Sequence, residues 1–292
     1  LVELAKVVAR YGGIYATHVR GERETYLEAI KEAIYIGERA KLPVQLSHIA
    51  PKYGSWGRSD EALRLVEEAR GRGVDVTLDN DVETSFSGSL RDLLPPKYQV
   101  LNEEELFELL RSRRGRERIR DEVLNERIPG FGPLGLLKHD KWEKIVVFKC
   151  EMKELEGKDL RRIAEERGEN PFDVFLDLLA EGVRCSLIFR DYVWKGDIER
   201  LLTHPLVIIS SDSAANSRRG PLPRILSSQY SPWDFGEFVK ILGKYVRDLG
   251  LLRLEEAIRK LTSFPAQRLG LMDRGLIREG MWADIVVFNL RR

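Results

Sequence analysis

The chain is poor in cysteine, has almost no net charge and lacks any long apolar run. Two cysteines among 292 residues are too few for a disulfide framework, so a reducing, cytoplasmic environment is predicted. No stretch of about 18 apolar residues occurs, which excludes a transmembrane helix. The 48 Lys and Arg balance 47 Asp and Glu, which excludes a generally basic protein that coats nucleic acid.

The composition favours a large globular protein that is rich in charged side chains. Hydrophobic residues make up 43% of the chain, which excludes wholesale disorder. Charged residues make up 33%, compared with about 25% in a typical protein. Asn, Gln, Met and Cys are scarce. Many charged side chains and few heat-labile ones are typical of proteins from a thermophilic source.

Short β-like runs alternate with helical periods along most of the chain. The first three runs are residues 14–18, 44–49 and 74–79, and helical stretches at 24–40 and 59–72 separate them. This alternation predicts a parallel sheet with crossover helices. The length suits a single barrel, because (β/α)8 barrels have about 250 residues.

After residue 144 the alternation resumes. Apolar runs at 145–148, 186–189 and 206–210 are predicted to be further strands of the same barrel. Two helices are expected near the end, at about 233–249 and 254–261.

The alternation of strands and helices, and one interruption of it, divide the chain into four predicted segments. The part before the interruption carries the first strands and the two histidines discussed below. A proline pair, a charged helical stretch and a loop rich in Gly and Pro then interrupt the pattern and indicate an inserted, lid-like segment. The predicted segments are barrel residues 1–84, lid residues 85–144, the remaining barrel 145–272, and a return strand into a β-sandwich, 273–292.

Two of the four histidines end neighbouring strands. His18 closes the first run and His48 closes the second, with one helix between them. Successive strand ends of a parallel barrel meet at one rim, so both imidazoles are expected within reach of a shared metal ion such as zinc. Alternatively, these side chains satisfy local hydrogen bonds, and spacing leaves both interpretations open. His139 and His204 are predicted to be structural or at the surface.

Several acidic residues follow strands at the same predicted rim. Asp212 comes soon after the buried run 206–209; beside a metal ion it could orient a water molecule and take its proton, or it could simply cap the next segment. Asp79, Asp81 and Glu83 cluster after the third strand. They could bind a cationic group or a metal ion, or form a solvated loop.

Two other features are predicted to carry no chemistry. The basic run 111–116 is followed by acidic residues, so a solvated helix face is favoured over a nucleic-acid site. Cys150 and Cys185 lie in apolar runs and are predicted to be buried and inert.

Five segments together resemble those of a known family. They are residues 12–20 (GGIYATHVR), 43–48 (PVQLSH), the Trp56-Gly57 turn, 204–212 and 273–288. In this order they are similar to the N-acyl-D-amino-acid deacylases, or D-aminoacylases, of the amidohydrolase superfamily. The resemblance covers nearly the whole chain. It implies the C-terminal part of a TIM-like (β/α)8 barrel, with an inserted lid and the start of a small β-sandwich.

The resemblance also implies zinc-dependent amide hydrolysis. His18 and His48 would be ligands of one or two zinc ions at the barrel mouth. Asp212 would be the general base for the attacking water, would return the proton to the leaving amine, and would be a further metal ligand. The family's first barrel strand supplies a His-x-His pair and a later one a bridging Cys or carboxylate. This sequence contains neither before His18.

Two departures from the family concern the substrate. Residues 81–83 read Asp-Val-Glu where the family commonly has Tyr-Pro-Tyr, and residues 231–233 read Ser-Pro-Trp where it often has His-Pro-Arg. Loss of a carboxylate-binding Arg, with Asp81 and Glu83 gained, favours a neutral or cationic substrate. Arg20 remains as a candidate anion contact, or as a partner of one of these acids.

The two ends of the sequence suggest a piece of a larger barrel. Residues 1–11 have the pattern of an amphipathic helix without a Met start, and the apolar run 283–288 needs neighbouring strands. We therefore expect an N-terminal segment or a second subunit to complete the barrel, in an oligomer.

Three functions remain open. The first is a deacylase-like amidohydrolase with an altered pocket that acts on a small amide. The second is a cyclic-amide hydrolase of the dihydroorotase or hydantoinase type, for which a bridging lysine rather than a cysteine is expected in the missing part. The third is a non-catalytic half-barrel subunit. No nucleic-acid or membrane partner is expected.

Overall fold

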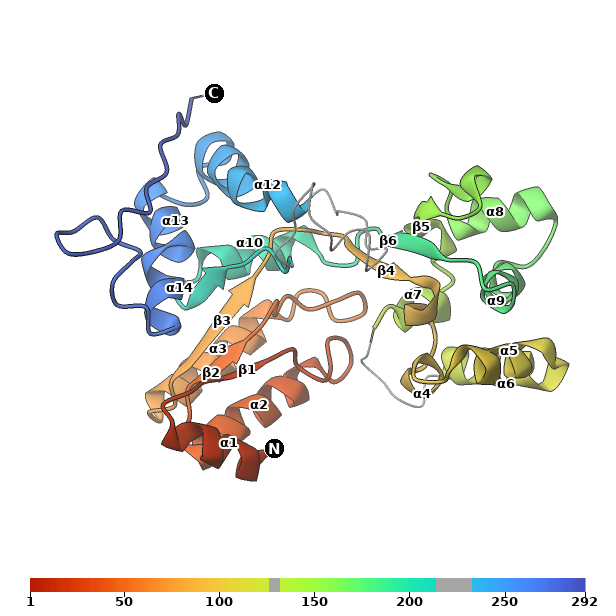
Figure 1. Cartoon of the computed structure of the whole chain (residues 1–292), viewed down its shortest axis with the longest axis horizontal. Helices are drawn as coiled ribbons and strands as arrows, with labels where there is room; N and C mark the ends of the chain where they lie inside the picture. Colours follow the sequence, from red (N-terminus) through yellow and green to blue (C-terminus); the bar gives the residue numbers. More distant parts are fainter. Residues whose placement is uncertain (126–131, 214–232, 292) are drawn as a thin grey trace.

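A computed structural model describes residues 1–125, 132–213 and 233–291, and it contains two different sheets (Figure 1). The parallel sheet has the order β1-β2-β3-β7, and the antiparallel sheet has the order β4-β6-β5. The strands are β1 (Tyr15–Thr17), β2 (Val44–Leu46), β3 (Val76–Asn80), β4 (Phe86–Ser89), β5 (Ile145–Cys150), β6 (Cys185–Phe189) and β7 (Val207–Ile209).

Helices occupy most of the remaining chain. Those that pack with the parallel sheet and near it are α1 (Val2–Arg10), α2 (Tyr26–Ala40), α3 (Ser59–Gly71), α10 (Lys195–Thr203), α12 (Trp233–Lys240), its π-helical continuation η4 (Ile241–Asp248), α13 (Leu254–Leu261) and α14 (Ser263–Arg268). Those of the middle segment are η1 (Leu90–Leu93), α4 (Pro96–Gln99), α5 (Glu103–Arg111), α6 (Arg113–Asn125), α7 (Leu134–Lys138), η2 (Trp142–Lys144), η3 (Lys153–Leu155), α8 (Leu160–Arg167) and α9 (Pro171–Ala180).

The parallel sheet has an apolar face that is covered by helices. Val44, Leu46, Val76 and Leu78 are fully buried, and α2, α3, α10 and α13 contact the strands. The alternating positions carry buried polar residues, and the hydroxyl of Thr77 donates to Oε1 of Gln45. The prediction of an α/β fold with a parallel sheet is confirmed.

A closed barrel is not what the described residues form. Their parallel sheet has four strands and is open, with β1 at one edge and β7 at the other. The strands β5 and β6 were expected in this sheet, but they pair with each other, and β6 also pairs with β4. The burial along β6 explains the difference: Cys185, Leu187 and Phe189 are buried while Ser186 and Ile188 are half-buried, as in an antiparallel strand with one covered face.

The middle segment has its own hydrophobic core. Its buried residues run from Leu90 to Tyr192 and include the ring cluster of Trp142, Phe172 and Phe175. Figure 1 shows this unit beside the parallel sheet and its helices. The second core therefore continues well beyond residue 144, where the predicted lid ends.

The two cysteines are buried, as predicted, but they are not free. Cys150 on β5 and Cys185 on β6 occupy directly paired positions and form a disulfide. The expectation of two inert thiols is wrong, because strand pairing brings together residues that are 35 positions apart. This bond also removes the sequence argument for a reducing compartment.

The C-terminal run does not form the predicted buried strand. Residues 283–288 adopt no regular structure, and Val286 and Val287 are 82% and 92% exposed. The run has the apolar composition of a strand, but a strand also needs a neighbour for its backbone hydrogen bonds. The described part of the chain places none beside it.

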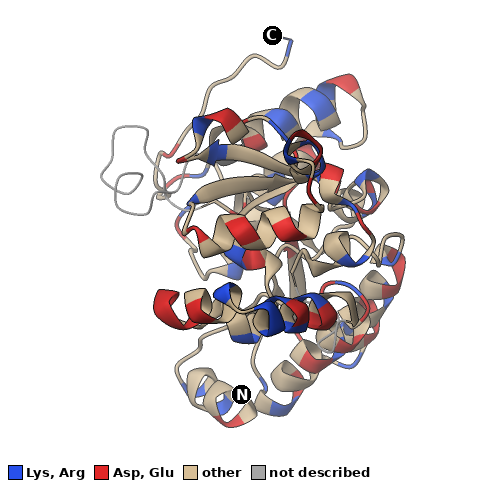
Figure 2. Ribbon diagram, turned by 90° about the vertical axis from the view of Figure 1, so that its right-hand side faces the viewer, with Lys and Arg blue, Asp and Glu red and all other residues tan. Residues whose placement is uncertain are grey.

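Side chains of both charges occur along the helices. Lys and Arg alternate with Asp and Glu along the helices in Figure 2, in keeping with the net charge of +1. Among the helices described, none is both long and apolar enough to cross a bilayer.

Candidate functional site

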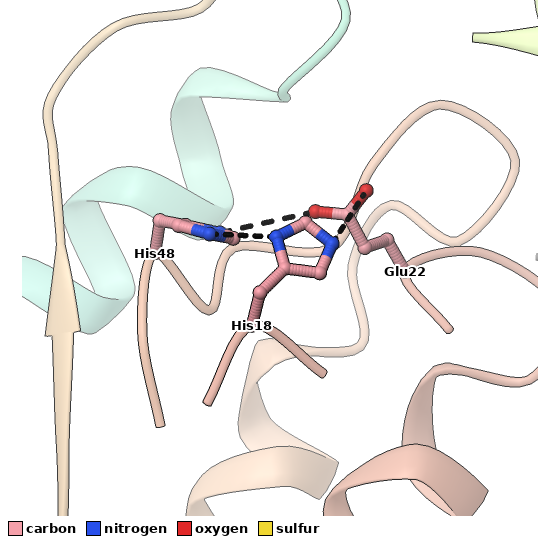
Figure 3. Close-up of side chains that lie close together, drawn as sticks. All are labelled: His18, Glu22 and His48. Atoms are coloured by element: carbon pink, nitrogen blue, oxygen red, sulfur yellow. Dashed lines mark hydrogen bonds and ion pairs between the residues drawn. The ribbon is translucent and has the colours of Figure 1, made fainter. Parts of the chain in front are cut away.

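The C-terminal ends of the parallel strands bring the predicted histidines together. His18 directly follows β1, and His48 follows β2 after one intervening residue. Nδ1 of His18 lies 2.8 Å from Nε2 of His48, and the ring centroids are 4.4 Å apart (Figure 3). The expected meeting of both imidazoles at one sheet edge is what the structure shows.

Glu22 adds a carboxylate to this pair. Its Oε2 lies 3.8 Å from Nε2 of His18, and its Oε1 lies 3.9 Å from Nδ1 of His48 (Figure 3). Ligand atoms of the three residues all lie within 4.8 Å of one another. Two imidazole nitrogens and one carboxylate oxygen are a donor set that zinc accepts in catalytic sites, so the residues fit a metal ion.

The sequence analysis missed Glu22. The available signal was its position four residues after His18, but the residues between them form an irregular loop rather than a helix. Spacing carries no information on side-chain direction in such a loop. Glu22 is largely buried, with Nζ of Lys52 3.7 Å from its Oε1.

The protonation state of His18 suits metal binding. Burial lowers the pKa of this imidazole, and the carboxylate of Glu22 opposes the effect. The neutral ring is the form that binds a metal ion. Binding therefore needs no protons to be removed from His18 at neutral pH.

The backbone at His48 is held in an unusual conformation. Its φ is 38°, in the left-handed region that non-glycine residues seldom occupy. The N–H of His48 donates to Oδ1 of Asp79 at 2.9 Å. Oδ2 of Asp79 accepts from Nε2 of Gln45 at 2.6 Å, and Ser210 donates to Oδ1 at 3.2 Å. Asp79 thus ties the ends of β2, β3 and β7 together and positions His48.

Asp79→Ala is expected to lower metal affinity by about 10–100-fold, the usual effect of losing a residue that orients a ligand. The fold should persist, because the apolar strands remain. Titration of the metal-free protein with zinc measures the effect. Asp60→Ala is the control, since Asp60 pairs with Arg200 on the exposed surface; equal zinc affinity in both variants contradicts the positioning role.

Asp212 lies in the same cavity but outside the compact group of three. A cavity of about 140 Å³ is lined by His18, His48 and Asp212, together with Asp81 and Glu83. Although residue 212 is exposed as a whole, burial of its carboxyl group raises the pKa, and His48 acts in the opposite direction. Its φ of 50° also lies in the left-handed region. This position suits a group that exchanges protons beside the imidazoles.

The other predicted residues divide into two groups. Asp81 and Glu83 line the cavity, whereas Arg20 does not: its Nε lies 2.8 Å from Oε2 of Glu32, and its side chain is 68% exposed. Arg20 therefore pairs with neither of the two acids expected as its partners. Of the stretch 231–233, the first two residues lie outside the described part of the chain.

The remaining histidines lie away from this cavity. The ring of His139 packs against Tyr53, and Nε2 of His204 lies 3.0 Å from Oε1 of Glu67. Tyr192, from the core of the middle segment, and Val193, from the core of the parallel-sheet unit, also line the cavity, and neither was predicted from the sequence. The cavity thus lies between the edge of the parallel sheet and the second unit.

Imidazoles and carboxylates meet at the strand ends of an open α/β sheet, in an arrangement that could hold a metal ion. Comparison with known proteins identifies the family. Residues 141–292 match the model of the amidohydrolase family, and the chain belongs to that family. D-aminoacylase of Alcaligenes xylosoxydans xylosoxydans is 31% identical over 99% of this chain and 48% of its own length. N-acyl-D-glutamate deacylase of the same organism is 28% identical over 98% and 47%.

Solved structures agree with this assignment. A D-aminoacylase crystal structure has a TM-score of 0.68 at 28% identity, over 99% of this chain and 49% of that one. A second, from work on the binuclear metal centre of D-aminoacylase, has a TM-score of 0.66 at 28% identity, over 97% and 48%. The resemblance to the D-aminoacylases is confirmed. The chain spans about half the length of the relatives it matches.

Proposed function

We propose that the protein to which this chain belongs is a metal-dependent amidohydrolase of the N-acyl-D-amino-acid deacylase type. The observation that carries the proposal is the convergence of His18, His48 and Glu22 beside Asp212 in one cavity at the sheet edge. Relatives named as D-aminoacylase and N-acyl-D-glutamate deacylase support the reaction class.

Each residue has a distinct part in the proposed reaction. His18 and His48 would hold zinc, as one or two ions, and Glu22 or Asp212 would supply a carboxylate ligand. A bound zinc ion supplies polarisation of the amide carbonyl and a lowered pKa for water. Asp212 takes a proton from the attacking water and returns it to the nitrogen of the leaving amine.

The pocket differs from that of an enzyme that binds carboxylated substrates. Asp81 and Glu83 line the cavity, and Arg20 is turned to Glu32 on α2. Acidic walls repel a substrate carboxylate and attract a cation. We propose a small neutral or cationic amide as the substrate.

The open sheet suggests what completes the site. Within the described residues β1 and β7 each have one neighbouring strand, and α1 exposes Leu4 and Val7. Unpaired sheet edges and exposed apolar side chains favour association with further strands. We propose that an N-terminal segment of the same protein, or a second subunit, supplies them and further metal ligands.

The proposed function is tested on the protein purified from its source. We expect about one or two zinc ions per chain by plasma emission and loss of amide hydrolysis on chelation, restored by zinc. The substrates to compare are N-acetyl-D-amino acid amides, their L isomers and a hydantoin. Hydrolysis of the D amides indicates a deacylase, and hydrolysis of the hydantoin indicates a cyclic-amide hydrolase. An intact assembly without metal or hydrolysis would instead indicate a structural subunit.

A further inference from the structure

Side chains of α12 contact the loop that carries two acidic residues of the cavity wall, Asp81 and Glu83. Glu237 is only 2% exposed, and its Oε1 accepts a hydrogen bond from the N–H of Val82. Nζ of Lys240, one turn further along, donates to Oε1 of Glu83 at 2.5 Å and to the carbonyl of Val82 at 3.3 Å. Side chains of one helix therefore clamp the loop that follows β3.

The second oxygen of Glu237 lies away from water. Oε2 is buried and receives no hydrogen bond from an N–H or O–H of the described residues. The carboxyl group of Glu83 lies near enough to raise the pKa of Glu237. Because Glu237 is buried beside this second carboxyl group, its ionised form is costly and its protonated form is favoured.

The surroundings of Glu237 favour its protonated form. Burial raises the pKa of Glu237 to about 8; the N–H of Val82 opposes the shift, while Asp81 and Glu83 reinforce it. Lys240 on the same helix, Tyr245 on η4 and Asp212, which faces Asp81, also interact with this cluster. At neutral pH Glu237 can thus donate a hydrogen bond to Glu83.

Of the two acids on the 81–83 loop, this clamp engages Glu83 and leaves Asp81 to face the cavity. The charge of Glu83 is engaged by Lys240 and its carboxyl group by Glu237. Asp81 lines the cavity with His18 and Asp212, and its Oδ1 accepts from the N–H of Glu83 at 2.9 Å. The conformation of the loop therefore decides where the carboxylate of Asp81 lies.

We propose that Glu237 is a positioning residue for substrate recognition: the hydrogen bond that it accepts from the N–H of Val82 fixes the 81–83 loop, so that Asp81 binds an alkylammonium or guanidinium group. The inference rests on the proposed function for the meaning of this binding, because it assigns the substrate class of the same cavity. The binding itself is measurable without hydrolysis.

Calorimetry on the purified protein tests the proposed cation-binding site at Asp81, called the receptor below. The probe is n-butylguanidinium, and n-butylurea is its uncharged analogue. We expect the cation to bind at least about tenfold more tightly, as for a hydrogen-bonded charge pair. Asp81→Asn should abolish the difference, and Glu237→Leu should reduce it. Glu237→Gln should retain it, because the amide can accept from Val82 and donate to Glu83.

The pH dependence of the melting temperature tests the protonated form of Glu237. In the native protein Glu237 keeps its proton up to about pH 8, whereas the unfolded chain loses it near 4.5. Stability from this group is therefore full below 4.5 and falls as pH rises to about 8. The wild type should lose stability relative to Glu237→Gln between pH 6 and 8.

The outcomes separate the two proposals. Equal binding of the cation and the urea by the wild type overturns the receptor. Equal loss of cation binding in Glu237→Gln and Glu237→Leu, or parallel melting curves over pH, overturns the clamp. If the Leu variant does not fold, Asp81→Asn and the pH comparison decide. A protein that binds the cation but hydrolyses no amide refutes the proposed function and leaves the receptor standing.

Discussion

His48→Asn is expected to remove the bound metal and to reduce amide hydrolysis by at least about 10³-fold, while the protein remains folded. The physical reason is the small number of donors. Catalytic zinc sites use three protein ligands, and the compact group at this sheet edge contains three residues. Removing one imidazole leaves His18 and Glu22, too few to hold the ion in the described part of the site.

Asparagine is the suitable replacement because of the backbone at this position. His48 has a φ of 38°, and Asn tolerates the left-handed region better than Ala. The N–H at residue 48 can still donate to Asp79. A loss of metal is then due to the missing imidazole rather than to a displaced strand end.

Plasma emission and kcat/KM measure the result, with His139→Asn as the control. His139 packs against Tyr53 outside the cavity, so its replacement should leave zinc content and hydrolysis unchanged. A His48→Asn protein that keeps the wild-type zinc content would refute the ligand assignment. Circular dichroism of both variants shows whether the fold is retained.

Local pattern predicts the elements of this protein well and their partners poorly. The strands β1, β2 and β3 and the helix α13 lie where alternation and helical periodicity indicate, because these signals depend on neighbours in sequence. Pairing depends on residues far apart. The run that became β5 is as apolar as a barrel strand, yet it pairs with β6 and closes a disulfide there.

The same distinction holds at the site. His18 and His48 could be placed together because parallel strands end at one edge, a rule that needs only the order of strands and helices. Glu22 and Glu237 could not, since one lies in an irregular loop and the other reaches the cavity wall from a helix 155 residues beyond Val82. Their roles depend on tertiary contacts that no local pattern encodes.

Asp212→Asn is expected to reduce kcat by about 10²–10⁴-fold while zinc remains bound, which separates it from the histidine variants. The carboxylate lies outside the compact group of ligands but lines the same cavity as both imidazoles. An amide of the same shape cannot accept a proton from water. The proton transfer is therefore lost, whereas His18, His48 and Glu22 are unchanged.

The backbone again provides the matched control. Asp191 also has a positive φ, 48°, but its exposed side chain pairs with Lys144 and does not line the cavity. Asp191→Asn should therefore have wild-type kcat. Any effect of replacing Asp by Asn at a position with left-handed backbone conformation would appear in both variants. If Asp212→Asn loses its zinc as His48→Asn does, Asp212 is a ligand rather than a base. If it keeps both zinc and wild-type kcat, the proton must be taken by another group in the cavity, and Glu22 is the carboxylate nearest the imidazoles.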